Sequence, residues 1–170
     1  MLNKKVTDLL NNQVNKELYS AYLYLDFANF YADEGLNGFA NWYQIQAQEE
    51  RDHAMLFIEY LQNNDGKVVL EAIDKPDIKM SVPMDPLKAG LAHEQYVTEL
   101  IHTIYEAAYN EKDFRTMQFL DWFVKEQGEE ETNASDLIKK MELFGSDPKA
   151  LYLLDQEMAS RTYSAPSLTL

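Results

Sequence analysis

The chain has 170 residues and no Cys, so it is the size of one domain with room for a substantial core, and it can form neither disulfides nor thiolate metal sites. Its formal net charge of −14 argues against nucleic acid or an anionic membrane as a partner, because both are bound by clustered Lys and Arg. With no signal peptide and no apolar run that could span a membrane, residues 1–170 are expected to form one soluble, cytoplasmic domain whose acidic excess suits cations.

Apolar residues at helical spacing predict a first long helix from about residue 3 to residue 32. The stripe comprises Val6, Leu10, Val14, Glu17, Ala21, Tyr24 or Leu25, and Ala28. Glu17 is thus a carboxylate on a face directed at the interior, where it needs a partner. Gly35 and Gly38 mark a tight turn, and we expect the helix that follows to pack antiparallel to the first.

The second predicted helix, residues 37–64, carries Glu50 and His53 near its middle. The two residues are three positions apart and therefore share one helix face, where they can hold one cation together. Both occupy positions of the apolar stripe, so they point at the interior of the bundle.

Residues 66–83 have no helical period and form too long a connection to be an ordinary loop. The helix over residues 37–64 is about 42 Å long at 1.5 Å per residue. The 18 residues from 66 to 83 reach roughly 60 Å when extended. The loop can therefore run the full length of the bundle, which leaves the next helix parallel to the previous one.

A third helix is predicted to begin with Asp85 as its N-cap and Pro86 as its first residue, and to end near Tyr109. Asp113 is the expected N-cap of a fourth helix, from about Phe114 to Phe144. Polar residues again interrupt the apolar stripes, namely Glu94 in the third helix and Gln127 and Glu130 in the fourth.

A second Asp-Pro pair predicts a short fifth helix over about residues 147–159. The main bundle then spans residues 3–144, and residues 160–170 are expected to be a loose tail. The predicted fold class is all-α, a four-helix bundle with one long crossover loop and a short fifth C-terminal helix.

The four buried acids are expected to meet in one central layer. At 1.5 Å per residue, their depths along the helices are about 20 Å for Glu17 and Glu50, about 14 Å for Glu94 and about 25 Å for Glu130. Four carboxylates carry a charge of −4, which two divalent cations neutralise with His53 as a neutral ligand. Oxygen-rich ligation with imidazole suits iron or manganese better than copper or a structural zinc.

Four motifs resemble those of the bacterial non-haem ferritins, and the similarity covers nearly the whole chain. They are Asn15-Lys16-Glu17-Leu18-Tyr19-Ser20-Ala21-Tyr22, Glu49-Glu50-Arg51-Asp52-His53-Ala54, Ala92-His93-Glu94-Gln95 and Glu126-Gln127-Gly128-Glu129-Glu130-Glu131. The resemblance implies a ferritin-like iron-storage protein with ferroxidase activity. Such a protein oxidises Fe(II) with oxygen or hydrogen peroxide at a di-iron site inside each subunit and stores the ferric mineral inside a homo-oligomeric cage of 24 subunits.

The resemblance also implies a role for each site residue. Glu17, Glu50 and His53 look like the ligands of the first iron, and Glu50, as a bridge, joins Glu94 and Glu130 around the second. The resemblance further implies that Gln127 is a neighbour or weak ligand of the two irons and that Tyr24 lies beside the centre. It also implies that Glu49, Glu126 and Glu129 form an additional iron site that shares Glu130.

The haem-containing bacterioferritins have a similar arrangement of ligands on four helices, but this sequence differs from them at two places. They carry a second Glu-x-x-His on the fourth helix and a haem-ligating Met within the Glu-x-x-His of the second. Here residues 127–130 contain no His, and Arg51 stands where the Met would be. We therefore expect two irons per subunit, a third if the additional site binds, and no haem. Gly128 lowers the stability of the fourth helix by about 1 kcal/mol relative to Ala. The only reasons that the sequence suggests are bending of the helix or the close approach of another group beside the site.

Several alternatives stay open at this point. The position of Tyr24 is explained equally well by core packing and by a role beside the metal centre. Glu49, Glu126 and Glu129 could instead form a solvated helix face. Trp122 reads as a packing residue. His93 and His102 have no partner at ligand spacing and read as surface or interface residues.

Three other functions compete. A rubrerythrin-like di-iron peroxidase usually carries a rubredoxin-like module, which a chain without Cys cannot form. A DNA-protecting mini-ferritin places its ligands across a subunit interface and often has a basic tail, whereas here the ligand set lies in one acidic chain. The third alternative is a purely structural bundle whose acids are solvated.

Overall fold

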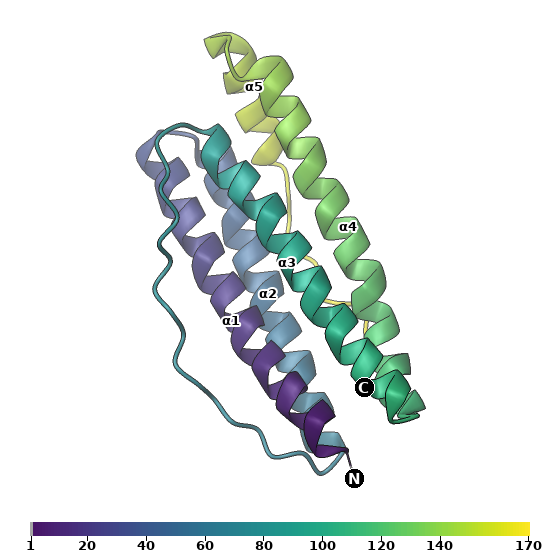
Figure 1. Cartoon of the computed structure of the whole chain (residues 1–170). Coiled ribbons are helices and arrows are strands. Elements are labelled where there is room, and N and C mark those ends of the chain that lie inside the picture. Colours follow the sequence, from purple (N-terminus) through teal and green to yellow (C-terminus); the bar gives the residue numbers. More distant parts are fainter. Residues whose placement is uncertain (1) are drawn as a thin grey trace.

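The structure, a computed structural model, describes residues 2–170 and contains, within that range, five α-helices and no strand. The helices are α1 (Lys4–Asp33), α2 (Asn37–Asn63), α3 (Met84–Asn110), α4 (Phe114–Phe144) and α5 (Pro148–Met158), as Figure 1 shows. The predicted all-α bundle with a short fifth helix is confirmed. No helix in the described part of the chain is long and apolar enough to cross a membrane.

The helices form two antiparallel pairs, α1 with α2 and α3 with α4 (Figure 1). The crossover loop between α2 and α3 runs along the length of the bundle, so α3 is parallel to α2, as the loop length predicts. Two side chains of α1 hold the loop. Asn11 donates to the Lys67 carbonyl at 3.0 Å and accepts from the Val69 amide at 2.7 Å, and Asn15 donates to the Ala72 carbonyl at 3.0 Å.

Two of the three predicted helix caps are confirmed. Asp113 accepts from the backbone N–H of Thr116 at 3.1 Å, and Asp147 accepts from that of Ala150 at 2.7 Å. The prediction for Asp85 is wrong, because α3 begins one residue earlier, at Met84. The Asp85 carboxylate lies in the first turn and accepts instead from the amides of residues 81 and 82, at 2.7 and 3.0 Å.

The interior consists of two apolar clusters with a polar layer between them. One cluster includes Leu23, Tyr24, Phe27, Tyr31, Phe39, Tyr43, Leu87 and Leu137. The other includes Val6, Leu10, Phe57, Leu61, Val97, Ile101, Phe119 and Phe123. Each long helix passes from one cluster to the other at its buried acid, which is Glu17, Glu50, Glu94 or Glu130. The predicted central layer of acids is therefore present.

The fifth helix is held against the start of α2 by a close backbone approach at Gly38. A Cβ atom at this position would lie 1.7 Å from the carbonyl oxygen of Asp155, so only glycine allows the contact. The buried Asp155 side chain accepts from the Phe39 amide at 3.0 Å and satisfies one of the free N–H groups at the start of α2. Gly38 thus fixes where α5 docks.

The prediction of a loose tail is wrong, because the segment after α5 is bound to the bundle. In Figure 1 the yellow tail leaves α5 and runs back along the bundle. Tyr163 donates to Asp52 of α2 at 2.5 Å, Trp122 of α4 donates to Ser167 at 3.0 Å, and Leu168 packs on an apolar cluster. We call residues 160–168 the C-terminal strap. The strap has no helical period, so its contacts with the bundle, among them a hydrogen bond from Asn41 to the Arg161 carbonyl, hold it in place.

Candidate metal centre

Glu17 of α1 and Glu50 and His53 of α2 form a compact buried group. Their side chains offer ligand atoms that all lie within 4.8 Å of one another, and the three residues are 1%, 2% and 2% exposed. The Nδ1 atom of His53 lies 3.4 Å from Oε2 of Glu50. The one-turn spacing in α2 and the antiparallel packing of α1 bring the three together.

Two polar atoms of this group lack a hydrogen bond. Within residues 2–170, Oε2 of Glu17 and Nδ1 of His53 are buried and make no hydrogen bond. Such orphaned groups are rare in native proteins, because desolvating them without compensation costs free energy. A carboxylate oxygen and an imidazole nitrogen without hydrogen bonds, in a group whose ligand atoms lie within 4.8 Å of one another, are the donors that iron and manganese take, so the residues fit a cation.

Two glutamines orient the carboxylates. Gln13 donates to Oε1 of Glu17 at 2.8 Å, and Gln46 donates to Oε1 of Glu50 at 3.0 Å. Each glutamine is buried and stands four residues before its acid. Its hydrogen bond holds one carboxylate oxygen, while Oε2 of Glu17 makes no hydrogen bond and Oε2 of Glu50 lies 3.4 Å from Nδ1 of His53. Neither glutamine was singled out from the sequence. The signal was a Gln four residues before Glu17 and another four residues before Glu50.

Glu94 of α3 and Glu130 of α4, 3% and 7% exposed, lie outside this tight group. Both line a cavity of about 20 Å³ that Tyr24 and Gln46 also border. Tyr24 donates a hydrogen bond to Oε1 of Glu94, and Gln127 donates to its Oε2 at 3.1 Å. Tyr24 also packs its ring against neighbouring aromatic rings, so it makes both a core contact and a hydrogen bond to Glu94.

Burial changes the protonation of several groups in this layer. Burial, reinforced by Glu50, raises the pKa of Glu17 to about 8 and that of Glu130 to about 7. Burial, with Glu50 and Glu130, raises the pKa of Glu94 well above its usual range. Burial lowers the pKa of His53, but Glu50 and Glu17 outweigh it and raise that pKa to about 10. Protons therefore supply the balancing charge that a cation would otherwise provide.

Within the described residues, the three acids of the predicted additional site do not form a compact group like that of Glu17, Glu50 and His53. Glu49 is half-buried and its Oε2 lies 2.5 Å from Nη2 of Arg161, a residue that the sequence reasoning did not single out. Glu126 is half-buried, and burial raises its pKa. Glu129 is exposed and paired with Lys125 at 3.5 Å. Glu49 thus holds an arginine where the resemblance implies a metal.

His93 is half-buried, and the interface alternative given for it stays a prediction. Its Nε2 lies 2.7 Å from the Ser20 hydroxyl, its ring packs on Tyr19 and Tyr24, and burial lowers its pKa. The exposed position of His102 agrees with the prediction.

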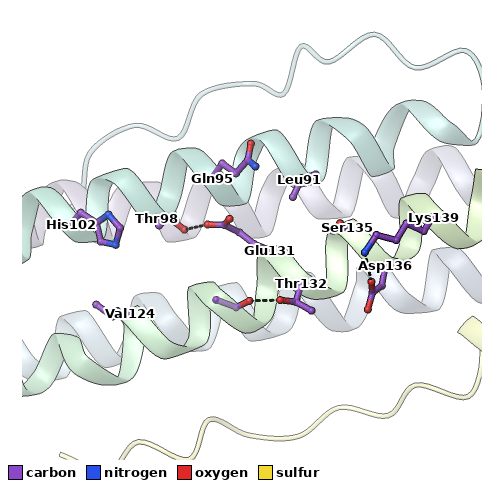
Figure 2. Close-up of a pocket in the computed structure, with 11 residues that line it drawn as sticks. Leu91, Gln95, Thr98, His102, Val124, Glu131, Thr132, Ser135, Asp136 and Lys139 are labelled. Carbon is purple, nitrogen blue, oxygen red and sulfur yellow. Dashed lines mark hydrogen bonds and ion pairs between the residues drawn. The ribbon is translucent and has the colours of Figure 1, made fainter.

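Gly128 approaches nothing within the described chain. A Cβ atom there would meet no heavy atom within 4 Å. It lies in the wall of a groove of about 530 Å³ between α3 and α4, where Glu131 accepts a hydrogen bond from Thr98 at 2.6 Å (Figure 2). Close packing inside the chain therefore does not explain this glycine.

Comparison with known proteins agrees with this arrangement. A family model described as a ferritin-like domain matches residues 7–144. The bacterial non-haem ferritin of Staphylococcus saprophyticus is 37% identical over 163 residues, which are 96% of this chain and 98% of the relative. That of Campylobacter jejuni is 38% identical over 156 residues, or 92% and 93% of the two chains.

Solved structures give the same result. An engineered closed form of the Archaeoglobus fulgidus ferritin superimposes with a TM-score of 0.94 at 41% identity, over 96% of this chain and all of the other. The open-pore ferritin of the same archaeon superimposes with a TM-score of 0.93 at 41% identity, over 95% of this chain and all of the other. The chain therefore belongs to the ferritin family.

Proposed function

We propose that this protein stores iron, with ferroxidase activity that oxidises Fe(II) with oxygen and deposits ferric oxyhydroxide inside a cage of subunits. The observation that carries the proposal is the buried Glu17–Glu50–His53 group, in which Oε2 of Glu17 and Nδ1 of His53 make no hydrogen bond within the described residues. The proteins similar to this chain over nearly all of its length are ferritins.

The proposed ligands of the first iron are Glu17, Glu50 and His53. Glu50 also serves the second iron together with Glu94 and Glu130, and its influence on the pKa values of both acids supports this assignment. We further propose that the oxidant is oxygen, that 24 copies of residues 1–170 form the cage, and that the protein works in the cytoplasm.

The chain's own residues prepare this site for paired oxidation. Two Fe(II) ions together supply the two electrons that reduce one oxygen molecule to peroxide, and carboxylate oxygens favour the ferric product. Gln13 and Gln46 hold one oxygen of each first-iron carboxylate, and Tyr24 and Gln127 hold the two oxygens of Glu94. Burial between two apolar clusters excludes bulk water.

An anaerobic Fe(II) titration tests the proposal. We expect saturation at about two Fe(II) per chain, the number that a paired site holds. Admission of oxygen should then oxidise the bound Fe(II) with the appearance of ferric absorbance, and further iron should accumulate as mineral within the assembled particle. If Fe(II) binding does not saturate before oxygen is admitted, the proposed ferroxidase activity is contradicted. If the assembled particle is too small to enclose mineral, the proposed iron storage is contradicted.

Metal binding should release protons, which gives a test that needs no oxidation. At pH 7 the Glu17 carboxyl, with a pKa of about 8, and the His53 imidazole, with a pKa of about 10, both carry a proton. Because a cation binds their deprotonated forms, Zn(II) should displace about two protons per chain. Protons compete harder as the pH falls, so affinity should decrease from pH 8 to pH 6. Calorimetry in buffers of different ionisation enthalpy measures both effects, and an affinity independent of pH would refute them.

A further inference from the structure

Tyr43 of α2 is a buried tyrosine that lies outside the four sequence motifs and the proposed ligand set. It is 4% exposed, and its ring centroid lies 5.6, 5.4 and 5.7 Å from those of Tyr24, Phe27 and Tyr31. Its hydroxyl reaches α3 at Gly90, where an added Cβ atom would lie 3.3 Å from the hydroxyl oxygen. Glycine is unfavourable in the middle of a helix, and here the missing side chain makes room for the phenol.

Tyr43 and Gly90 both line the cavity of about 20 Å³ that Glu94 and Glu130 border. A cavity of about 10–15 Å³ or more admits one water molecule, provided that the water finds at least two polar partners. The two carboxylates can accept hydrogen bonds, and the Tyr43 hydroxyl can donate one. The cavity therefore has the size and the chemistry for a single water molecule.

The Tyr43 hydroxyl is available to such a water. Of the two tyrosine hydroxyls at the cavity, that of Tyr24 donates to Oε1 of Glu94, whereas that of Tyr43 forms no hydrogen bond within residues 2–170. Burial, reinforced by Glu94, raises the pKa of Tyr43 above its usual range, so the hydroxyl keeps its proton. A buried donor without a partner is costly, and a water molecule in the cavity removes that cost.

We propose that the cavity holds one water molecule, which accepts a hydrogen bond from Tyr43 and donates to Glu94 and Glu130. Tyr43 is then a positioning residue, because it acts through this water on one acid of α3 and one acid of α4. Gly90 provides the space that the arrangement needs. The inference rests on the proposed function, since Glu94 and Glu130 are the proposed ligands of the second iron.

Crystal structures of the metal-free protein test the water directly. In the natural chain we expect one ordered water within about 3 Å of the Tyr43 hydroxyl and of a carboxylate oxygen of Glu94 or Glu130. The water should be lost in Tyr43→Phe, which keeps the ring and removes the donor, and in Gly90→Ala, which fills the space. A natural chain without this water, or a Tyr43→Phe variant that retains it, overturns the proposal.

Zn(II) calorimetry on the assembled protein tests the positioning without any redox step. Tyr43→Phe should bind the first Zn(II) with the natural affinity and the second about tenfold more weakly, as is usual when a group behind a metal ligand is lost. A merely structural role of Tyr43 would weaken both ions or neither, and either result overturns the proposal.

Gly90→Ala reaches the same water from the other side of the cavity. It keeps the Tyr43 hydroxyl and should also weaken the second Zn(II) about tenfold. Combining Gly90→Ala with Tyr43→Phe should weaken it no further, because both changes remove one water molecule and their effects are not additive. A loss of about 100-fold in the double variant would show independent effects and overturn the shared water.

Tyr31→Phe is the matched control. Tyr31 is 0% exposed, its ring stacks on that of Tyr43 with 8° between the planes, and its hydroxyl donates to the Pro83 carbonyl at 2.6 Å. The same chemical change thus removes a buried hydroxyl from the same aromatic stack at a residue outside the lining of the cavity. Both Zn(II) affinities should stay natural in Tyr31→Phe, and a selective loss at the second ion equal to that in Tyr43→Phe overturns the proposal.

The titrations separate failure of the inference from failure of the proposed function. A natural chain that takes up only one Zn(II) contradicts the second iron position and, with it, this inference. A natural chain that takes up two, with no response to Tyr43→Phe, overturns the inference alone. If Tyr43→Phe does not assemble, Gly90→Ala carries the same test, because it removes no packing group.

Discussion

A Glu50→Ala variant is expected to oxidise its first two Fe(II) ions per chain about 100-fold more slowly than the natural chain. Glu50 belongs to the group with Glu17 and His53, and it influences the pKa values of Glu94 and Glu130. Its loss therefore disturbs both proposed iron positions at once. Stopped-flow measurement of ferric absorbance at two Fe(II) per chain checks the rate.

The fold should survive this substitution. Removing one partner of the buried Glu50–His53 pair leaves the other without its opposite charge, so the melting temperature should fall by several degrees while the bundle still folds. Glu59→Ala, at an exposed position of the same helix, is the control and should oxidise iron at the natural rate. His53→Ala and Glu130→Ala should each impair paired oxidation as well. A natural rate in Glu50→Ala would exclude the proposed centre.

A Phe123→Ala variant is expected to lose about 3–5 kcal/mol of unfolding free energy, the usual cost of removing a buried phenyl ring. Phe123 is 1% exposed, and its ring centroid lies 4.3 Å from that of Phe57 and 4.9 Å from that of Trp122. The same ring lies 5.8 Å from the His53 imidazole. The cavity should therefore also weaken Zn(II) binding, because His53 loses a neighbour that holds it in place.

Two variants on the same helix separate these effects. Phe123→Leu keeps most of the apolar volume and should lose less stability, with tighter Zn(II) binding than Phe123→Ala. Val124→Ala, at a position 40% exposed, should change stability by about 0.5 kcal/mol or less. Guanidinium unfolding and Zn(II) titration measure the two quantities. A loss in Phe123→Ala no greater than that in Val124→Ala would show that the ring is not part of the core.

The helices were predictable because their signals are local. The 3.6-residue period marks α1 to α4, Asp113 and Asp147 read as N-caps from their positions alone, and counting 1.5 Å per residue places the four acids at one level. The length of residues 66–83 was enough to predict the crossover. The start of α3 was missed because the Asp85 carboxylate accepts from the amides before it instead of those after it.

The sequence by itself determined the all-α bundle, the layer of buried acids and the pairing of Glu50 with His53, because helix geometry relates all of them to residue spacing. Only the tertiary structure decided which side chains meet across helices. Gln13 and Gln46 act through rotamers that periodicity does not specify, Gly38 matters only once α5 is docked, and Arg161 meets Glu49 across 112 residues of chain. The strap has no period of its own, so its position depends on contacts that form only after the bundle has folded.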